Sequence, residues 1–293
     1  MTQPQTGSSP TSPSSSTPRV RKNIDSLTQD ELNAYINAVT ALVNSTEQYY
    51  NYIYFEQLHD RTNVGPCEHN RETFLPWHRM ALWLYEDGLR RIDPNVTIPY
   101  WDFTQLPSGD RYPTAFEDTS SILYNYTPPA GGGVSAGDYR NVGAICKPGI
   151  DPSTCLDLPW PYDRVLNTVL NISQWSTTTG SPNFGGGTNG YGECDPIPPG
   201  QNPPPTGPGK LEFGPHNDTH SNYVAGYLSD TNTAGMDPLF WSFHTFIDLL
   251  WDQWQQQGNT VDTCLTCGLC WNEPNPAYQP FTMGDVIDVG GPR

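Results

Sequence analysis

Six histidines are the residues whose type and spacing point most directly to chemistry. They form two groups of three along the chain: His59, His69 and His78, then His216, His220 and His244. His216 and His220 are four residues apart, so on one helix their rings lie on the same face, about one turn apart. His244 falls on the next amphipathic segment. Two ligands from one helix and a third from its neighbour predict a three-histidine metal site inside a helical bundle.

The first group needs a different arrangement. His69 and His78 are nine residues apart and would face opposite ways on one helix. We therefore expect His69 before a helix that Pro76 starts, His78 in its first turn, and His59 as the third ligand from the preceding segment. A purely imidazole ligand set suits copper or zinc. Asp248, one turn after His244, is expected to accept a hydrogen bond from that ring.

The elements that position these groups are predicted to be helices. Helical periodicity and end signals favour four helices, over residues 26–43, 76–91, 215–228 and 238–254, and an aromatic-rich segment at 49–58 leads to His59. Residues 127–210 are rich in Gly and Pro and predict a long surface wrap. The fold class expected is mainly α, with a central four-helix bundle wrapped by long loops and little β structure. Residues 1–19 read as a flexible Ser/Thr/Pro-rich arm, and 20–293 as a single domain.

Composition narrows the possible partners. The chain has 14 Lys+Arg against 31 Asp+Glu, a net charge of -17. This balance argues against nucleic acid and anionic membrane surfaces as partners, because both need clustered cations. No apolar run approaches the roughly 20 residues that span a bilayer. Seven Cys and five Asn-X-Ser/Thr sequons favour a secreted, extracellular protein, although residues 1–18 contain no signal peptide.

Three segments carry a resemblance to a known family. Residues 74–79, Phe-Leu-Pro-Trp-His-Arg, resemble the copper-A signature of tyrosinases and catechol oxidases. Residues 215–220 and 237–248 resemble the copper-B signatures of that family. The match runs in order across roughly residues 20–290, and the chain looks like the short secreted fungal members.

The resemblance implies a dinuclear copper centre that binds O2. His59, His69 and His78 would bind copper A, and His216, His220 and His244 would bind copper B. His59 is assigned as the remaining histidine, since no motif marks it. The family commonly has two adjacent histidines in the copper-B helix; here the first position is Phe243, and the ligand falls on His244.

The implied reaction is the oxidation of small phenols: o-diphenols to o-quinones, together with o-hydroxylation of monophenols. Glu212 and Asn217 match family positions that hold and orient a water able to accept the phenol proton. Ser221, Phe243 and Thr231 fall at positions expected to govern substrate access. The longer family members carry a C-terminal domain that plugs the site, and residues 20–293 are expected to lack one. The oligomeric state stays open.

The odd cysteine has an implied role. Cys67 lies two residues before His69, where fungal members form a thioether to that histidine. Six cysteines then remain for three disulfides: Cys146, Cys155, Cys194, Cys264, Cys267 and Cys270. Their pairing is open, with Cys146–Cys155 suggested by proximity alone.

Several functions remain as alternatives. One is a catechol, o-aminophenol or methoxyphenol oxidase with little action on monophenols. Another is an O2 carrier of the hemocyanin type. A third is a zinc hydrolase, which would use one histidine group and leave the other without a role.

Overall fold

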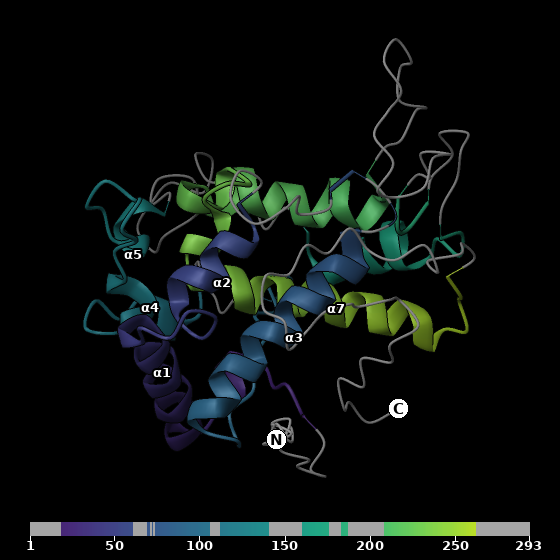
Figure 1. The fold of residues 1–293 in the computed structure, drawn as a ribbon. Coiled ribbons are helices and arrows are strands. Elements are labelled where there is room, and N and C mark those ends of the chain that lie inside the picture. Colours follow the sequence, from purple (N-terminus) through teal and green to yellow (C-terminus); the bar gives the residue numbers. More distant parts are fainter. Residues whose placement is uncertain are drawn as a thin grey trace, which may run out of the picture.

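Two long helices, α3 (Phe74–Ile92) and α7 (Leu239–Gln256), pack against each other through the middle of the protein (Figure 1). The computed structural model describes residues 19–60, 69–70, 72, 74–105, 112–140, 160–175, 183–186 and 208–261 of the 293-residue chain. Both helices are amphipathic, and their apolar faces supply much of the core. Each carries one histidine toward the other, so their packing decides where the two histidine groups meet.

The remaining elements surround this pair. The other α-helices are α1 (Gln29–Asn44), α2 (Tyr52–Leu58), α4 (Ile122–Asn125), α5 (Ala136–Tyr139) and α6 (Tyr162–Val165). Short 3₁₀ turns are η1 (Ile24–Ser26), η2 (Thr114–Phe116), η7 (Gly226–Ser229) and η8 (Ala234–Met236). Three segments are π-helical: η4 (Leu166–Leu170), η5 (Glu212–His216) and η6 (Thr219–Val224). The described residues hold two isolated β-bridges and no longer strand, so the mainly α prediction is confirmed.

Helix ends differ slightly from the sequence expectations. Helix α1 begins at Gln29, because Thr28 and Glu31 form a reciprocal capping box there. Pro76 is the third residue of α3 and does not start it. Proline is tolerated at that depth because the first-turn N–H groups have no partner within the helix. The end of α3 at Ile92, just before Asp93-Pro94, agrees with the prediction.

The expected regular helix over 215–228 is instead largely π-helical. Pro215 lies inside η5. A proline cannot donate to the carbonyl four residues earlier, and the wider π-helical turn accommodates this missing bond. The helix is consequently distorted where it carries His216 and His220.

A buried ion pair fixes the start of α7. Arg140 donates to Asp237 at 2.5 and 2.8 Å and to the carbonyls of Phe116 and Leu123. Both charged side chains are almost completely buried. Asp237 also accepts from the backbone N–H of Leu239, the first residue of α7, at 2.8 Å. The loop carrying α4 and α5 is thereby tied to the ligand-bearing helix.

The described part of the chain begins at Arg19. Arg19, assigned to the flexible arm, pairs with Glu86 at 3.4 Å and Asp87 at 3.6 Å on α3. Arg19 therefore belongs to the folded domain. Residues 1–18 lie outside the described part of the chain. No helix among the described residues has the length and hydropathy needed to cross a membrane.

Candidate metal centre

The first histidine group comes together as the sequence predicts. His59 follows the last residue of α2, His69 precedes α3, and His78 lies on α3. One nitrogen from each ring lies within 4.8 Å of the others, a spacing that one metal ion can bridge. His78 is the fifth residue of α3, because the helix begins before Pro76. It therefore lies in the second turn and not in the expected first.

The second group forms an equivalent cluster. His216 ends η5, His220 lies on η6 and His244 lies on α7. All three are buried, and one nitrogen from each lies within 4.8 Å of the others. The rings of His216 and His220 are 4.4 Å apart, so the π-helical distortion keeps them on one face.

Backbone and amide oxygens fix the orientation of four rings. His59 Nδ1 lies 2.6 Å from the Thr231 carbonyl, and His78 Nδ1 lies 2.8 Å from the Phe74 carbonyl. In the second group His220 Nδ1 is 2.7 Å from the Leu228 carbonyl, and His216 Nδ1 is 2.8 Å from Asn217 Oδ1. Oxygens of these kinds only accept, so each Nδ1 carries the proton and each Nε2 presents a lone pair.

The resulting Nε2 geometry fits a metal ion. His59 Nε2 and His78 Nε2 are 3.2 Å apart, and His220 Nε2 and His244 Nε2 are 3.0 Å apart. In the first pair both nitrogens are acceptors once Nδ1 holds the proton, so no hydrogen bond joins them. His216 Nε2 is buried and accepts no hydrogen bond from the described residues. A cation held between such lone pairs would satisfy them.

Burial keeps His78, His216, His220 and His244 neutral, as metal ligands must be. Burial, reinforced by neighbouring histidines, lowers the pKa of His78, His216 and His244 well below the usual value for imidazole. Burial also lowers the pKa of His220 to about 4. The two clusters contain imidazole alone. This donor set fits copper, and the residues present therefore fit a pair of copper ions.

The two clusters form one centre. The rings of His78 and His244 stack, with centroids 4.4 Å apart and planes 9° apart. Phe74, four residues before His78, reaches across to His216 at 4.6 Å. Phe240, four residues before His244, reaches across to His59 at 4.8 Å. Each helix thus contributes a Phe-x-x-x-His unit whose phenyl ring packs on a ligand of the opposite cluster.

Glu212 and Asn217 lie beside the ligands that the sequence linked them to. Glu212 is 1% exposed and accepts from the backbone N–H of Asn70, the residue after His69, at 2.7 Å. Glu212 therefore connects η5, which carries His216 of the second cluster, to the residue next to His69 of the first cluster. Asn217 is half-buried, and its side-chain oxygen is committed to His216.

The three residues predicted to govern access have different positions. Ser221 is exposed. Thr231 contacts the first cluster through its backbone carbonyl, which accepts from His59. Phe243 is fully buried and packs on His216, with centroids 5.8 Å apart and planes 21° apart. Phe243 therefore forms an inner wall behind a ligand and does not face solvent.

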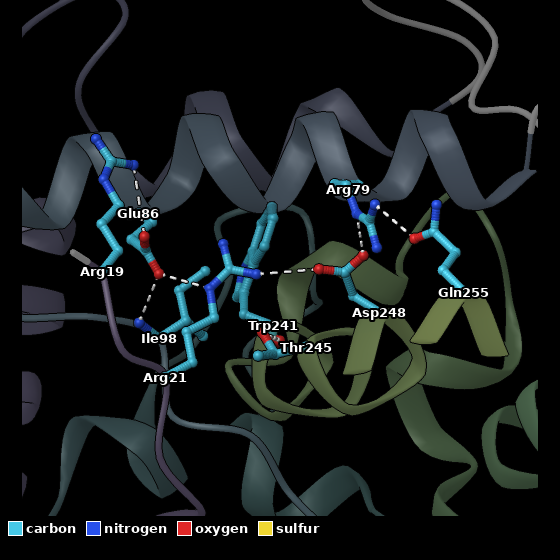
Figure 2. Close-up of polar contacts among 9 residues, drawn as sticks. All are labelled: Arg19, Arg21, Arg79, Glu86, Ile98, Trp241, Thr245, Asp248 and Gln255. Atoms are coloured by element: carbon cyan, nitrogen blue, oxygen red, sulfur yellow. Dashed lines mark hydrogen bonds and ion pairs between the residues drawn. The ribbon is translucent and has the colours of Figure 1, made fainter. Parts of the chain in front are cut away.

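The expected hydrogen bond from His244 to Asp248 is not formed, and that prediction is wrong. Among the described residues, His244 Nδ1 has no hydrogen-bond partner. Asp248 accepts instead from Arg79 at 2.5 Å and from Arg21 at 3.3 Å, as Figure 2 shows. A guanidinium is a stronger partner for a carboxylate than a neutral imidazole.

These arginines link the ligand-bearing helices to the N-terminal segment. Arg79 follows His78 directly on α3, so its bond to Asp248 ties α3 to α7 (Figure 2). Arg21 also donates to Glu86 on α3 at 2.7 Å. The ionic cluster lies between the two helices and stabilises their packing, while leaving the histidine rings to other partners.

Sequence reasoning missed the backbone acceptors and the aromatic walls. The carbonyls of Phe74, Leu228 and Thr231 carry no side-chain signal. Phe74 and Phe240 were recoverable, because each lies four residues before a ligand on the same helix face. All seven cysteines lie outside the described residues, so the thioether and the disulfides stay predictions.

Comparison with known proteins agrees with this geometry. The common central domain of tyrosinase matches residues 46–257. The chain is 28% identical to a tyrosinase of Streptomyces lincolnensis over 289 residues, covering 92% of this chain and 89% of that protein. It is 28% identical to a putative tyrosinase-like protein of Caenorhabditis elegans, covering 83% of this chain but only 32% of that longer protein. It likewise covers 38% of a Hahella tyrosinase.

Solved structures show the same fold. A polyphenol oxidase from Vitis vinifera superposes with a TM-score of 0.61 at 21% identity, covering 85% of this chain and 74% of that one. An octopus hemocyanin functional unit gives a TM-score of 0.57 at 17% identity, covering 84% and 56%. With the domain match over most of the chain and two histidine clusters suited to two copper ions, the chain belongs to the tyrosinase family of dinuclear copper oxidoreductases.

Proposed function

We propose that this protein oxidises small phenols with O2, converting o-diphenols to o-quinones and hydroxylating monophenols at the ortho position. The observation that carries the proposal is the pair of all-histidine clusters meeting through the His78–His244 stack. Two copper ions bound there would supply the activation of O2. Two o-diphenols each lose two hydrogens, and one O2 becomes two waters. A monophenol takes up one oxygen atom of O2 and leaves as the o-quinone, while the other oxygen atom becomes water.

The chain itself orients the histidine ligands and excludes water from the metal centre. Fixed Nδ1 hydrogen bonds hold four rings in one tautomer, so no reorientation is needed when a ligand binds. The phenyl walls Phe74 and Phe240 and the buried Phe243 limit water around the clusters. Burial of this kind strengthens the polar interactions that remain inside.

Glu212 and Asn217 are our candidates for the proton step that monophenols require. A buried carboxylate raises the basicity of a water that donates to it. Asn217 uses its oxygen on His216, which leaves the amide N–H groups to orient such a water. The water would then accept the phenol proton, and Glu212 would stabilise the resulting charge.

Parallel rate measurements on tyrosine, phenol, catechol and o-aminophenol test this proposal. We expect turnover of catechol and of the monophenols. In Asn217→Gly and Glu212→Gln, normalised to bound copper, monophenol rates should fall by about 100-fold, the lower end of the range for acid–base catalysis. Catechol rates should change far less. Retained hydroxylation of tyrosine and phenol by both variants would rule out the proton role.

The same rates separate the alternatives. Oxidation of catechol or o-aminophenol without any monophenol turnover would identify a diphenol-type or aminophenol oxidase. Reversible O2 binding without turnover of any phenol would identify a carrier.

We propose that the exposed Ser221 keeps the entrance open to small phenols. Ser221→Phe should then raise KM for catechol while leaving copper content unchanged.

We further propose a thioether between Cys67 and His69, the feature that fungal members would share with this chain. Its formation removes one hydrogen from the thiol and one from the imidazole, with O2 as the two-electron acceptor. After full reduction, alkylation should modify six of the seven cysteines. Seven modified cysteines would disprove the link. The other six would form three disulfides, and peptide mapping would establish which cysteines pair.

We propose that the protein is secreted and glycosylated. The sequon residues Asn44, Asn95, Asn125 and Asn171 are exposed, whereas Asn217 is half-buried against His216. Expression through a secretory host should give glycans at up to those four sites and none at Asn217. A glycan on Asn217 would contradict its orientation toward the metal centre.

A further inference from the structure

One short loop touches both histidine clusters. The Leu228 carbonyl accepts from His220 of the second cluster at 2.7 Å. Three residues later, the Thr231 carbonyl accepts from His59 of the first cluster at 2.6 Å. A ligand in each cluster therefore takes its orientation from residues 225–231, which we call the bridging loop.

The bridging loop begins with two residues in an unfavourable backbone conformation, which contacts with the surrounding residues must maintain. Ala225 has φ 52° and ψ -143°, a region that side chains other than glycine seldom occupy. Gly226 follows at φ 59°, and a Cβ there would lie 2.5 Å from the Tyr139 carbonyl oxygen. Strained residues persist only where their surroundings determine them strongly, and they gather at functional sites.

The contacts of Tyr227 maintain this backbone conformation. The Tyr227 hydroxyl donates to the Gly131 carbonyl at 2.8 Å and lies 2.9 Å from the Val134 carbonyl. These contacts attach Tyr227 to the turn over residues 131–134. Its ring packs edge-on against Tyr139 at 4.6 Å. On the other side, the Thr233 hydroxyl donates to the Tyr227 carbonyl at 2.7 Å. Tyr227 is thus the anchor of the loop, directly before Leu228.

We propose that the bridging loop orients His59 and His220 together, and that Tyr227 is a positioning residue for both copper ions at once. A shift of the loop moves the Leu228 and Thr231 carbonyls as a unit. The two ligands then lose their preferred orientation in step. The proposal depends on the clusters holding copper and is independent of which phenol is oxidised.

Release of copper to a chelator from the copper-loaded protein tests this coupling. Tyr227→Phe removes only the anchoring hydroxyl. It should accelerate release of both ions by about 10-fold, the lower end of the effect of disturbing groups that orient metal ligands. Thr233→Val removes the second anchor, and it serves equally if Tyr227→Phe folds poorly. Phenol turnover plays no part in this readout, so a failure here leaves the proposed reaction standing.

Two matched controls make the result specific. Asn217→Ala removes a partner of His216 alone and should accelerate release of one ion of the two. Tyr139→Phe removes the hydroxyl of the neighbouring half-exposed tyrosine and should change neither. Copper release at the parental rate in Tyr227→Phe and Thr233→Val, despite lowered thermal midpoints, would reduce the loop to a structural role. Acceleration of a single ion in both would overturn the coupling.

Discussion

His78 and His244 stack face to face, with ring centroids 4.4 Å apart and planes 9° apart. One ring comes from α3 and the other from α7, so the helices that dominate the core meet at their ligands. A ligand of one cluster is therefore also a packing surface for the other.

Replacing His78 tests this dual role. His78→Phe keeps an aromatic ring against His244, whereas His78→Ala leaves a cavity that costs about 2–5 kcal/mol. Both variants should lose copper from the first cluster. Only His78→Ala should also weaken copper binding in the second, measured by metal titration. Equal binding at the second cluster in the two variants would show that the stack is incidental.

Asp248→Asn distinguishes a structural carboxylate from one that orients a ligand. The substitution removes the charge that pairs with Arg79 and Arg21. We expect a loss of about 1–3 kcal/mol in the free energy of unfolding, measured in urea. Copper affinity should change by less than about 3-fold, because His244 does not bond to Asp248. A loss of about 10–100-fold in affinity would restore the ligand-orienting role.

Arg140→Met should be among the most destabilising single changes. It leaves Asp237 buried and uncompensated at the start of α7, a situation that costs about 3–5 kcal/mol. Urea unfolding measures this cost, and the double variant with Asp237→Leu should recover part of it. The exposed pair of Lys22 and Glu31 is the matched control, and Lys22→Ala should cost less than about 1 kcal/mol. Similar costs for Arg140→Met and Lys22→Ala would contradict the account.

Glu56 should make stability depend on pH. Burial raises the pKa of Glu56 from 4.5 to about 7, although the Tyr126 hydroxyl, donating at 2.8 Å, opposes this. Because the pKa in the folded state is the higher one, the protonated acid's contribution is complete below about pH 4.5. It is lost as the pH rises through about 7, a change of about 3 kcal/mol.

Glu56→Gln cannot titrate and should remove this dependence. Unfolding free energies of the parent and the variant, measured between pH 5 and 8, should diverge in favour of the variant as the pH rises. Tyr126→Phe, which removes the hydroxyl alone, should retain a titrating Glu56. A constant difference between Glu56→Gln and the parent across that range would exclude the raised pKa.

The sequence could predict the side-chain ligands because their spacing follows helix geometry. His216 and His220 stay on one face even through a π-helical stretch, and Pro76 and Pro94 mark the two ends of α3 closely. The mainly α fold followed from the same periodicity.

Other features depend on tertiary contacts that no local pattern reports. The partner of Asp248 was misassigned because sequence spacing suggested His244, while Arg21 and Arg79 come from distant segments. Phe243 occupies a position where the family commonly has a histidine. Only the three-dimensional packing shows that its ring stacks against His216. The Leu228 and Thr231 carbonyls belong to a loop whose path is set by Tyr227.

Copper content per chain tests the central claim most directly. After reconstitution and gel filtration, elemental analysis should find two copper ions per chain in the parent. It should find one in each of His59→Ala and His220→Ala, and none in the double variant. One copper or less in the parent, or two retained in either single variant, would contradict a centre in which each histidine cluster holds its own copper ion.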